Sequence, residues 1–156
     1  MRAGELELQQ IPPDDAGFIA ALEEVGMPTS DLASSGGVYF ALFNEHAQAV
    51  GYCGYETLEE GEEDIAFIRS CVVPEAGRGK GAGRAMMDAL MDRLSDTGLS
   101  DLYLLTMDAD PFFERFGFKI ISRDDAPDAV RTTSQFSLEI CNGAVLMRRR
   151  PAGGVA

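Results

Sequence analysis

The sequence predicts an α+β (mixed α/β) fold built around one sheet. Strand-like segments dominate the first half of the chain, the longest amphipathic helix lies between two apolar strands, and the last strands alternate with helices. Two strands joined across a helix also predict one parallel step in the sheet. With 156 residues and 46% apolar content, the chain suits one domain, expected at residues 1–150, with a disordered tail at 151–156.

The first half is expected to contribute three strands and one helix. Residues 6–11 form a short strand, and residues 12–26 form a helix that begins with proline and aspartate and ends at a glycine. The strands at 38–43 and 49–58 are then expected to pair as an antiparallel hairpin. The acidic run at 59–64 is most simply a solvated loop.

The second half alternates apolar strands with helices. Its longest helix, at residues 80–96, has apolar residues four apart on one side and aspartates on the other, and Gly98 follows its end. Shorter helices are expected within residues 108–118 and 123–136. The strands are expected at residues 65–73, 102–107, 118–122 and 144–149.

Charge and cysteine content exclude several classes of function. The formal charge of −13 repels nucleic acid and anionic membranes, so we expect neither as a partner. This acidic composition is compatible with a halophilic source and also with a non-halophilic one. No apolar run is long enough to span a membrane, and the first residues lack a signal-peptide pattern, so we expect a cytoplasmic protein. Cys53, Cys71 and Cys141 are too few and too far apart for a disulfide framework or zinc site, and we expect reduced thiols and no metal.

A basic, glycine-rich segment precedes the longest predicted helix. Residues 77–83 contain four glycines, and Arg78, Lys80 and Arg84 add three cations to a chain that is otherwise acidic. A helix start exposes about four unpaired N–H groups and a partial positive charge, and glycine lets an anion approach them closely. The segment therefore predicts a binding site for a diphosphate.

The same segment also fits a turn that needs glycine only for its geometry, and nucleotide-binding motifs have to be considered as well. The pattern GxxxxGK[ST] is absent. Residues 77–82 match the loose pattern G-x-G-x-x-[GA], but they follow three or four strands, and Asp101 precedes its strand instead of ending it. The pattern that remains is R-x-x-G-x-G, from Arg78 to Gly83, after a buried strand.

The segment "IRSCVVPEAGRGKGAGRAMMDAL", followed by "LYLLTM", "FFERFGF" and "VLM", resembles the GNAT acyltransferase superfamily. The resemblance is strong over residues 65–123. It implies a single, mostly antiparallel sheet of about six or seven strands, splayed at an acetyl-CoA site and flanked by about four helices. It also implies acetyl-CoA as co-substrate. The coenzyme-binding residues it implies are Cys71, Val72 and Val73 along the pantetheine, and Arg78, Gly79, Lys80, Gly81, Ala82, Gly83 and Arg84 around the diphosphate.

The family often has a tyrosine, the general acid for the leaving thiolate, in the helix before the glycine–phenylalanine pair that corresponds to residues 117–118. This chain has Phe113 at that place. A thiol of pKa about 8.5 leaves reasonably well as thiolate, and water could protonate it. We expect Phe113 to pack in the core. The departure also motivates a rival hypothesis, in which the chain is a non-catalytic acyl-CoA-binding sensor.

Two branches of the superfamily are similar to this chain: the acetyltransferase domain of N-acetylglutamate synthase and the arsenic-resistance N-acetyltransferases. Both imply a primary amine on an α-amino acid or amino-acid-like toxin as acceptor. Arg69, inside an apolar strand, and Arg131 are expected to bind its carboxylate or oxyanion, with a further contact from Asn142. The alternatives are an ion pair of Arg69 with Glu63 or Asp64, and an exposed helix position for Arg131.

The expected reaction is direct acetyl transfer. Thr106 interrupts an apolar strand and could hold a water that accepts the amine proton, although threonine is also an ordinary strand residue. A backbone N–H near Cys71 would meet the oxyanion. The residues identify neither the acceptor, nor a general base, nor the oligomeric state; members of the resembled family are often homodimers.

Overall fold

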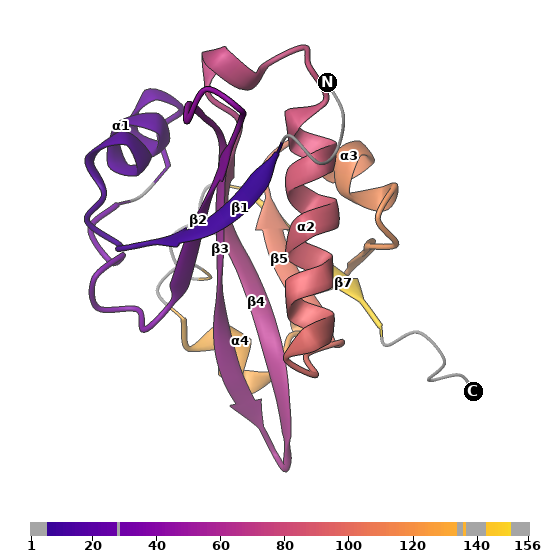
Figure 1. Ribbon diagram of the computed structural model, residues 1–156. Helices are drawn as coiled ribbons and strands as arrows, with labels where there is room; N and C mark the ends of the chain where they lie inside the picture. The colour runs from indigo at the N-terminus through magenta and orange to yellow at the C-terminus, as the bar shows by residue number, and fades with distance from the viewer. Residues whose placement is uncertain (1–5, 28, 134–135, 137–142, 151–156) are drawn as a thin grey trace. The chain divides into compact units, whose positions relative to one another are not determined.

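Within residues 6–27, 29–133, 136 and 143–150, which the computed structural model describes, seven strands form one sheet (Figure 1). The strands are β1 (Glu7–Ile11), β2 (Val38–Phe43), β3 (Ala49–Glu60), β4 (Glu63–Val72), β5 (Leu102–Thr106), β6 (Lys119–Ile121) and β7 (Val145–Arg149). The helices are α1 (Ala16–Glu24), α2 (Ala82–Asp96), α3 (Asp110–Glu114) and α4 (Asp128–Arg131), with 3-10 turns η2 (Glu75–Gly77) and η3 (Arg123–Asp125).

The sheet is mostly antiparallel, in the order β1-β2-β3-β4-β5-β7-β6. The β1/β2, β2/β3, β5/β7 and β6/β7 pairs are antiparallel. The β4/β5 pair is parallel, with Ala66–Ile68 beside Leu102–Leu104. The predicted α+β class, strand number and parallel step are therefore confirmed.

The described residues belong to two compact units, one of residues 1–55 and 70–94 and the other of residues 56–69 and 95–156. The boundary of a single domain at residue 150 stays a prediction. The predicted tail at 151–156 lies outside the described residues.

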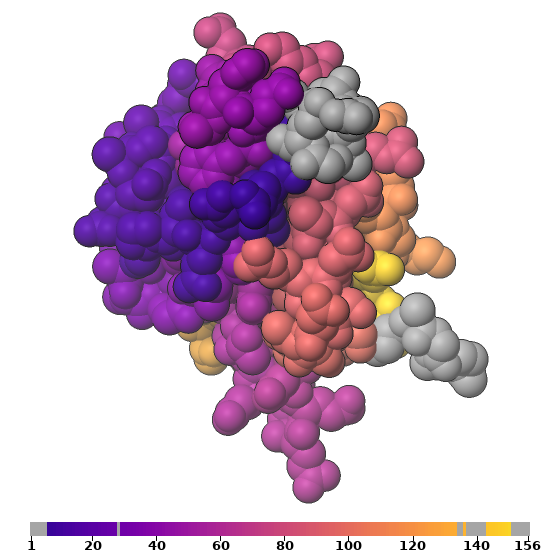
Figure 2. Space-filling view, viewed as in Figure 1, coloured from indigo at the N-terminus to yellow at the C-terminus, as the bar shows by residue number. Residues whose placement is uncertain are grey.

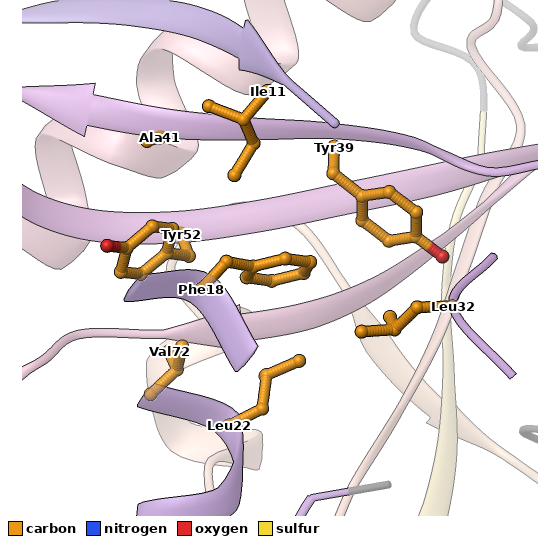
Figure 3. Close-up of a cluster of buried hydrophobic side chains, with 8 residues drawn as sticks. All are labelled: Ile11, Phe18, Leu22, Leu32, Tyr39, Ala41, Tyr52 and Val72. Carbon is orange, nitrogen blue, oxygen red and sulfur yellow. The ribbon is translucent and has the colours of Figure 1, made fainter. Parts of the chain in front are cut away.

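In the first unit, α1 packs against one face of its strands. Phe18 and Leu22, four residues apart on α1, are fully buried, because this spacing brings both side chains to the same side of a helix. The side chain of Asp15 caps the helix by accepting the N–H of Phe18 at 3.0 Å. Figure 3 shows the core that results, which consists of Ile11, Phe18, Leu22, Leu32, Tyr39, Ala41, Tyr52 and Val72.

Helix α2 packs against the opposite face of the same strands. Met86 lies against Gly51, where a Cβ would meet the methionine sulfur at 3.0 Å. The Arg93 guanidinium lies 4.9 Å from the ring centroid of Phe40 and donates to the Leu8 carbonyl at 2.7 Å. Alternate β2 residues therefore face α1 and α2, which explains why the middle of this strand is buried on both sides.

The second unit has its own core, formed by Ile65, Phe67, Tyr103, Ala126, Val130 and Leu146. Asp101, just before β5, accepts two hydrogen bonds of 2.8 Å from Arg148 on β7. These bonds raise the pKa of Arg148, whose guanidinium also lies 5.2 Å from the Tyr103 ring centroid. The pair thus links the residue before β5 to β7 and compensates a partly buried cation.

The acidic run at 59–64 is a hairpin tip and not the predicted loop. β3 extends to Glu60 and β4 begins at Glu63, so only residues 61–62 form the turn, where Gly61 has φ 65°. Residues 59–64 are all exposed, and the tip that they form is drawn in magenta in Figure 2. The apolar residues on either side set the strand pairing, which overrides the low strand preference of glutamate.

Candidate active site

The approach to the glycine-rich segment begins with an unusual residue in β4. Ser70 has φ 60° inside the strand, where a non-glycine residue in the left-handed region costs about 1–3 kcal/mol. Val72 packs into the α1 core and Cys71 is half-buried. The local break therefore changes the direction of the backbone N–H and C=O groups just before the predicted coenzyme loop. The sequence does not indicate this break, because serine, unlike glycine, does not signal a positive φ.

Burial raises the pKa of the Cys53 thiol well above its usual value, with a further rise from nearby Cys71 and a smaller opposing effect of Arg93. Cys53 is fully buried and keeps its proton at neutral pH. The structure thus supports a packing role for Cys53. Cys141 lies outside the described residues.

The loop between β4 and α2 presents a row of backbone N–H groups. The N–H groups of Gly77 and Arg78 bond back to Pro74 and Glu75, and the first helical bond runs from Ala85 to Gly81 at 3.1 Å. The N–H groups of residues 79–84, which lie between these bonds, have no acceptor among the described residues. Such a row at a helix start is the arrangement that binds anions.

The loop glycines serve different purposes. Gly79 and Gly81 have φ of 76° and 75°, and a Cβ on either would meet nothing within 4 Å, so these positions require glycine for conformation. Alternation of such residues with ordinary ones makes a concave nest of N–H groups. Gly77 has no positive φ, but a Cβ there would overlap the Val50 carbonyl oxygen of β3. Gly77 therefore lets the loop lie directly on the sheet.

The three predicted cations lie in or next to this row in the sequence, and their side chains differ in their contacts. Lys80 and Arg84 are exposed. The Arg78 Nε donates to the Val73 carbonyl at 3.0 Å, and its Nη2 lies 3.2 Å from Glu24 Oε1. Two donors of Arg78 are thus engaged by the protein, whereas the charges of the other two residues face solvent.

Arg69 is buried and paired in the second unit. Its side chain is 1% exposed, and its Nη1 lies 2.8 Å from Oε2 of Glu56 on β3. The partners expected from sequence proximity, Glu63 and Asp64, were wrong, because both are exposed at the hairpin tip. A buried carboxylate thirteen residues earlier could not be identified as the partner without the strand pairing.

Thr106 and Phe113 lie at the carboxyl end of β5 and in α3. Thr106 Oγ1 accepts the N–H of Ala109 at 3.0 Å, so the buried hydroxyl stabilises the turn into α3. The N-cap of α3 is Ala109, and Asp110 lies in the first turn. Phe113 is buried and packs edge-on against Phe112 at 5.1 Å between centroids, which confirms its predicted core position.

Arg131 is exposed at the end of α4 and is held by its own segment. Its Nε donates to the Ala126 carbonyl at 3.0 Å and its Nη2 to the Asp124 carbonyl at 2.6 Å. Asn142 lies outside the described residues. The loop residues thus belong to the unit of 1–55 and 70–94, whereas Arg69, Thr106 and Arg131 belong to the other.

Beyond the predicted site residues, three kinds of functional feature are relevant: a pocket, a metal site and a membrane-spanning helix. An open hollow of about 780 Å³ beside β1 is lined in part by Glu7, Phe43 and Asn44 and contains none of the predicted site residues. Across the ranges that the structure describes, no three His, Cys, Asp or Glu residues are grouped to hold a metal ion. None of the described helices is long and apolar enough to cross a bilayer.

The sequence matches a known family and a known relative. Residues 7–118 match the sequence model of the acetyltransferase (GNAT) family. An uncharacterized N-acetyltransferase of Chlorobaculum tepidum is 30% identical over 93 residues, which are 58% of this chain and 56% of the relative. The chain therefore spans about half the length of the curated relative it matches.

Solved structures share the fold. N-acetylglutamate synthase of Neisseria gonorrhoeae, complexed with coenzyme A and N-acetyl-glutamate, has TM-score 0.71 and 19% identity over 94% of this chain and 35% of its own. Rv2747 of Mycobacterium tuberculosis, in complex with CoA and NLQ, has TM-score 0.70 and 17% identity over 92% and 98%. A GNAT-family acetyltransferase of Staphylococcus aureus Mu50 has TM-score 0.69 and 19% identity over 92% and 98%.

Proposed function

The chain belongs to the acetyltransferase (GNAT) family, and from this premise we propose that it moves an acetyl group from acetyl-CoA to the primary amine of a small molecule. The observation that carries the proposal is the row of N–H groups at residues 79–84, which have no acceptor among the described residues and lie beside exposed Lys80 and Arg84. Paired phosphates supply the acceptors and the negative charge that this row lacks.

The loop suits a diphosphate better than a single carboxylate. The nest formed by Gly79 and Gly81 and the start of α2 offer donors over successive residues, so more than one anionic oxygen can be bound. The cations of this segment attract phosphate in a chain whose net charge of −13 would otherwise repel it. Cys71 and Val72, at the end of β4, and Val73, just after it, precede the loop and are proposed to contact the pantetheine through their backbone.

The proposed reaction is direct transfer. The acceptor ammonium loses one proton to water, and the free amine forms a bond to the thioester carbonyl carbon, after which the nitrogen loses a second proton to water. The carbon–sulfur bond then breaks, and the thiolate takes a proton from water. Positioning and a backbone N–H donor near Cys71 would stabilise the oxyanion. Thr106 remains a proposed contact for the water that accepts the proton of the amine, since a hydroxyl that accepts from Ala109 can still donate.

For the acceptor we propose an α-amino acid or amino-acid-like toxin. The synthase of similar fold has N-acetyl-glutamate bound, and the sequence resembles its branch and the arsenic-resistance branch. Arg131 is the proposed carboxylate or oxyanion ligand, whereas the buried pair of Arg69 with Glu56 favours the structural alternative for Arg69. The Nη1 group of Arg131 has no acceptor among the described residues, so a ligand oxygen could bind there without breaking the two existing bonds. A cytoplasmic location and a homodimer remain expectations.

A panel of amines tests the proposal. Purified protein with acetyl-CoA is supplied with glutamate, aspartate, methionine and phosphinic or arsonic glutamate analogues, and thiol release is followed. Turnover with at least one amine is expected. Absence of calorimetric binding of acetyl-CoA would refute the proposed function.

The second candidate function is a non-catalytic acyl-CoA sensor. Phe113 favours it, because its buried ring brings no hydroxyl to the place where the family often has tyrosine. Tight binding of acetyl-CoA without turnover of any amine would support the sensor over the enzyme.

A further inference from the structure

Arg78 in the coenzyme loop is held by a carboxylate from a distant segment. Its guanidinium contacts Glu24 Oε1 at 3.2 Å across 54 residues of sequence, while its Nε donates to Val73. We propose that Glu24 competes with the coenzyme diphosphate for Arg78, and so sets the affinity for CoA below what the loop alone would give. This inference rests on the proposed function.

The end of α1 explains why Arg78 is drawn there. Glu23 and Glu24 occupy the last turn of α1, and that turn contains no basic residue. Carboxylates at the negative end of a helix dipole are unfavourable, and a cation is favourable. Arg78 supplies the missing cation from outside the helix. Gly26, with φ 76° and its N–H bonded to the Glu23 carbonyl, ends the helix and fixes the position of this turn.

The core fixes both sides of the contact. Leu22 is two residues before Glu24, and Val72 is one residue before Val73. Both belong to the same buried cluster, and Figure 3 shows them next to each other beneath Phe18. The pair therefore joins two segments whose backbones are held in place, and only the ends of the side chains need to move when an anion replaces Glu24.

The direction of the effect follows from what holds Arg78. The Val73 carbonyl orients the guanidinium without help from Glu24, so loss of Glu24 does not release the side chain. Glu24 adds a negative charge beside the bound phosphates and must be displaced from Arg78 for full contact. Both effects weaken coenzyme binding. The two side chains are 50% and 62% exposed, so solvent reduces the effect to that of a surface pair.

The test measures the Kd of CoA by calorimetry at low salt. Glu24→Gln should bind CoA about threefold to fivefold more tightly than the unaltered protein. Glu23→Gln is the matched control, because it removes an equal charge from the neighbouring exposed position, for which the structure gives no contact with Arg78. It should change the Kd much less, and the difference between the variants should shrink as salt is added.

A double-mutant cycle separates competition at Arg78 from general repulsion. In an Arg78→Ala background, Glu24→Gln should lose most of its effect. An equal gain in that background, an equal gain in Glu23→Gln, or unchanged or weaker binding in Glu24→Gln would each overturn the inference while leaving the proposed function intact. If the unaltered protein does not bind CoA, the proposed function fails, and this inference fails with it.

Discussion

Two glycines of the same loop should respond in opposite ways to the same pair of substitutions. At Gly77 the obstacle is the backbone of β3: a Cβ would overlap the Val50 carbonyl oxygen and lie 3.0 Å from its carbon. Because a central strand cannot move as a flexible side chain does, Gly77→Ala should destabilise the protein by about 1–3 kcal/mol, the usual cost of overpacking. Gly77→Asn, which is larger, should cost more.

At Gly79 there is space but the backbone has φ 76°. Gly79→Ala should cost about 1–2 kcal/mol from conformation alone. Asparagine tolerates the left-handed region better than alanine does, so Gly79→Asn should cost less than Gly79→Ala. The order of Ala and Asn is therefore reversed between the two sites.

Urea unfolding of the four variants, followed by circular dichroism, gives these differences as shifts in midpoint at constant slope. An alanine at Gly77 that leaves stability unchanged would refute the close approach of the loop to Val50. The same order of Ala and Asn at both sites would refute the distinction between space and conformation.

The remaining predictions concern binding, turnover and pH. Replacing Arg78 and Lys80 together by alanine should weaken acetyl-CoA binding about tenfold, since each exposed cation contributes up to about 1 kcal/mol. An unchanged affinity in calorimetry would refute the proposed diphosphate site of the loop. Arg131→Leu should raise the acceptor KM several-fold with little change in the thermal midpoint, and an unaffected KM counts against its substrate role. Phe113→Tyr should keep the fold, and a large rise in kcat would show that thiolate protonation limits turnover. Burial raises the pKa of Cys53, so above about pH 8.5, the ordinary pKa of a thiol, the unfolded chain loses a proton that the folded chain keeps. Stability should then fall with rising pH by up to about 1.4 kcal/mol per unit from this group, and urea titrations from pH 8 to 10 should show a shallower fall in Cys53→Ala; equal slopes contradict the assignment.

Features encoded by neighbouring residues could be predicted, and those made by pairing of distant segments could not. The apolar side of α2 and the glycines before it follow from spacing along the chain, and both lie where the sequence places them. The carboxylate beside Arg69 was missed because Glu56 and Arg69 meet only through strand pairing. Ser70 was missed because its φ of 60° is imposed by the surrounding strand and not by serine itself.

The same distinction explains why the coenzyme site is better defined than the acceptor site. A diphosphate is bound largely by main-chain N–H groups of one continuous segment, so the glycines that shape residues 77–83 are themselves the signal. An acceptor is chosen by side chains from several segments, and their charges are altered by partners such as Glu56 at Arg69. The contact of Arg78 with Glu24 extends this distinction to the loop: the R-x-x-G-x-G pattern predicts Arg78 as a ligand, but it does not reveal the carboxylate 54 residues earlier that contacts the same guanidinium.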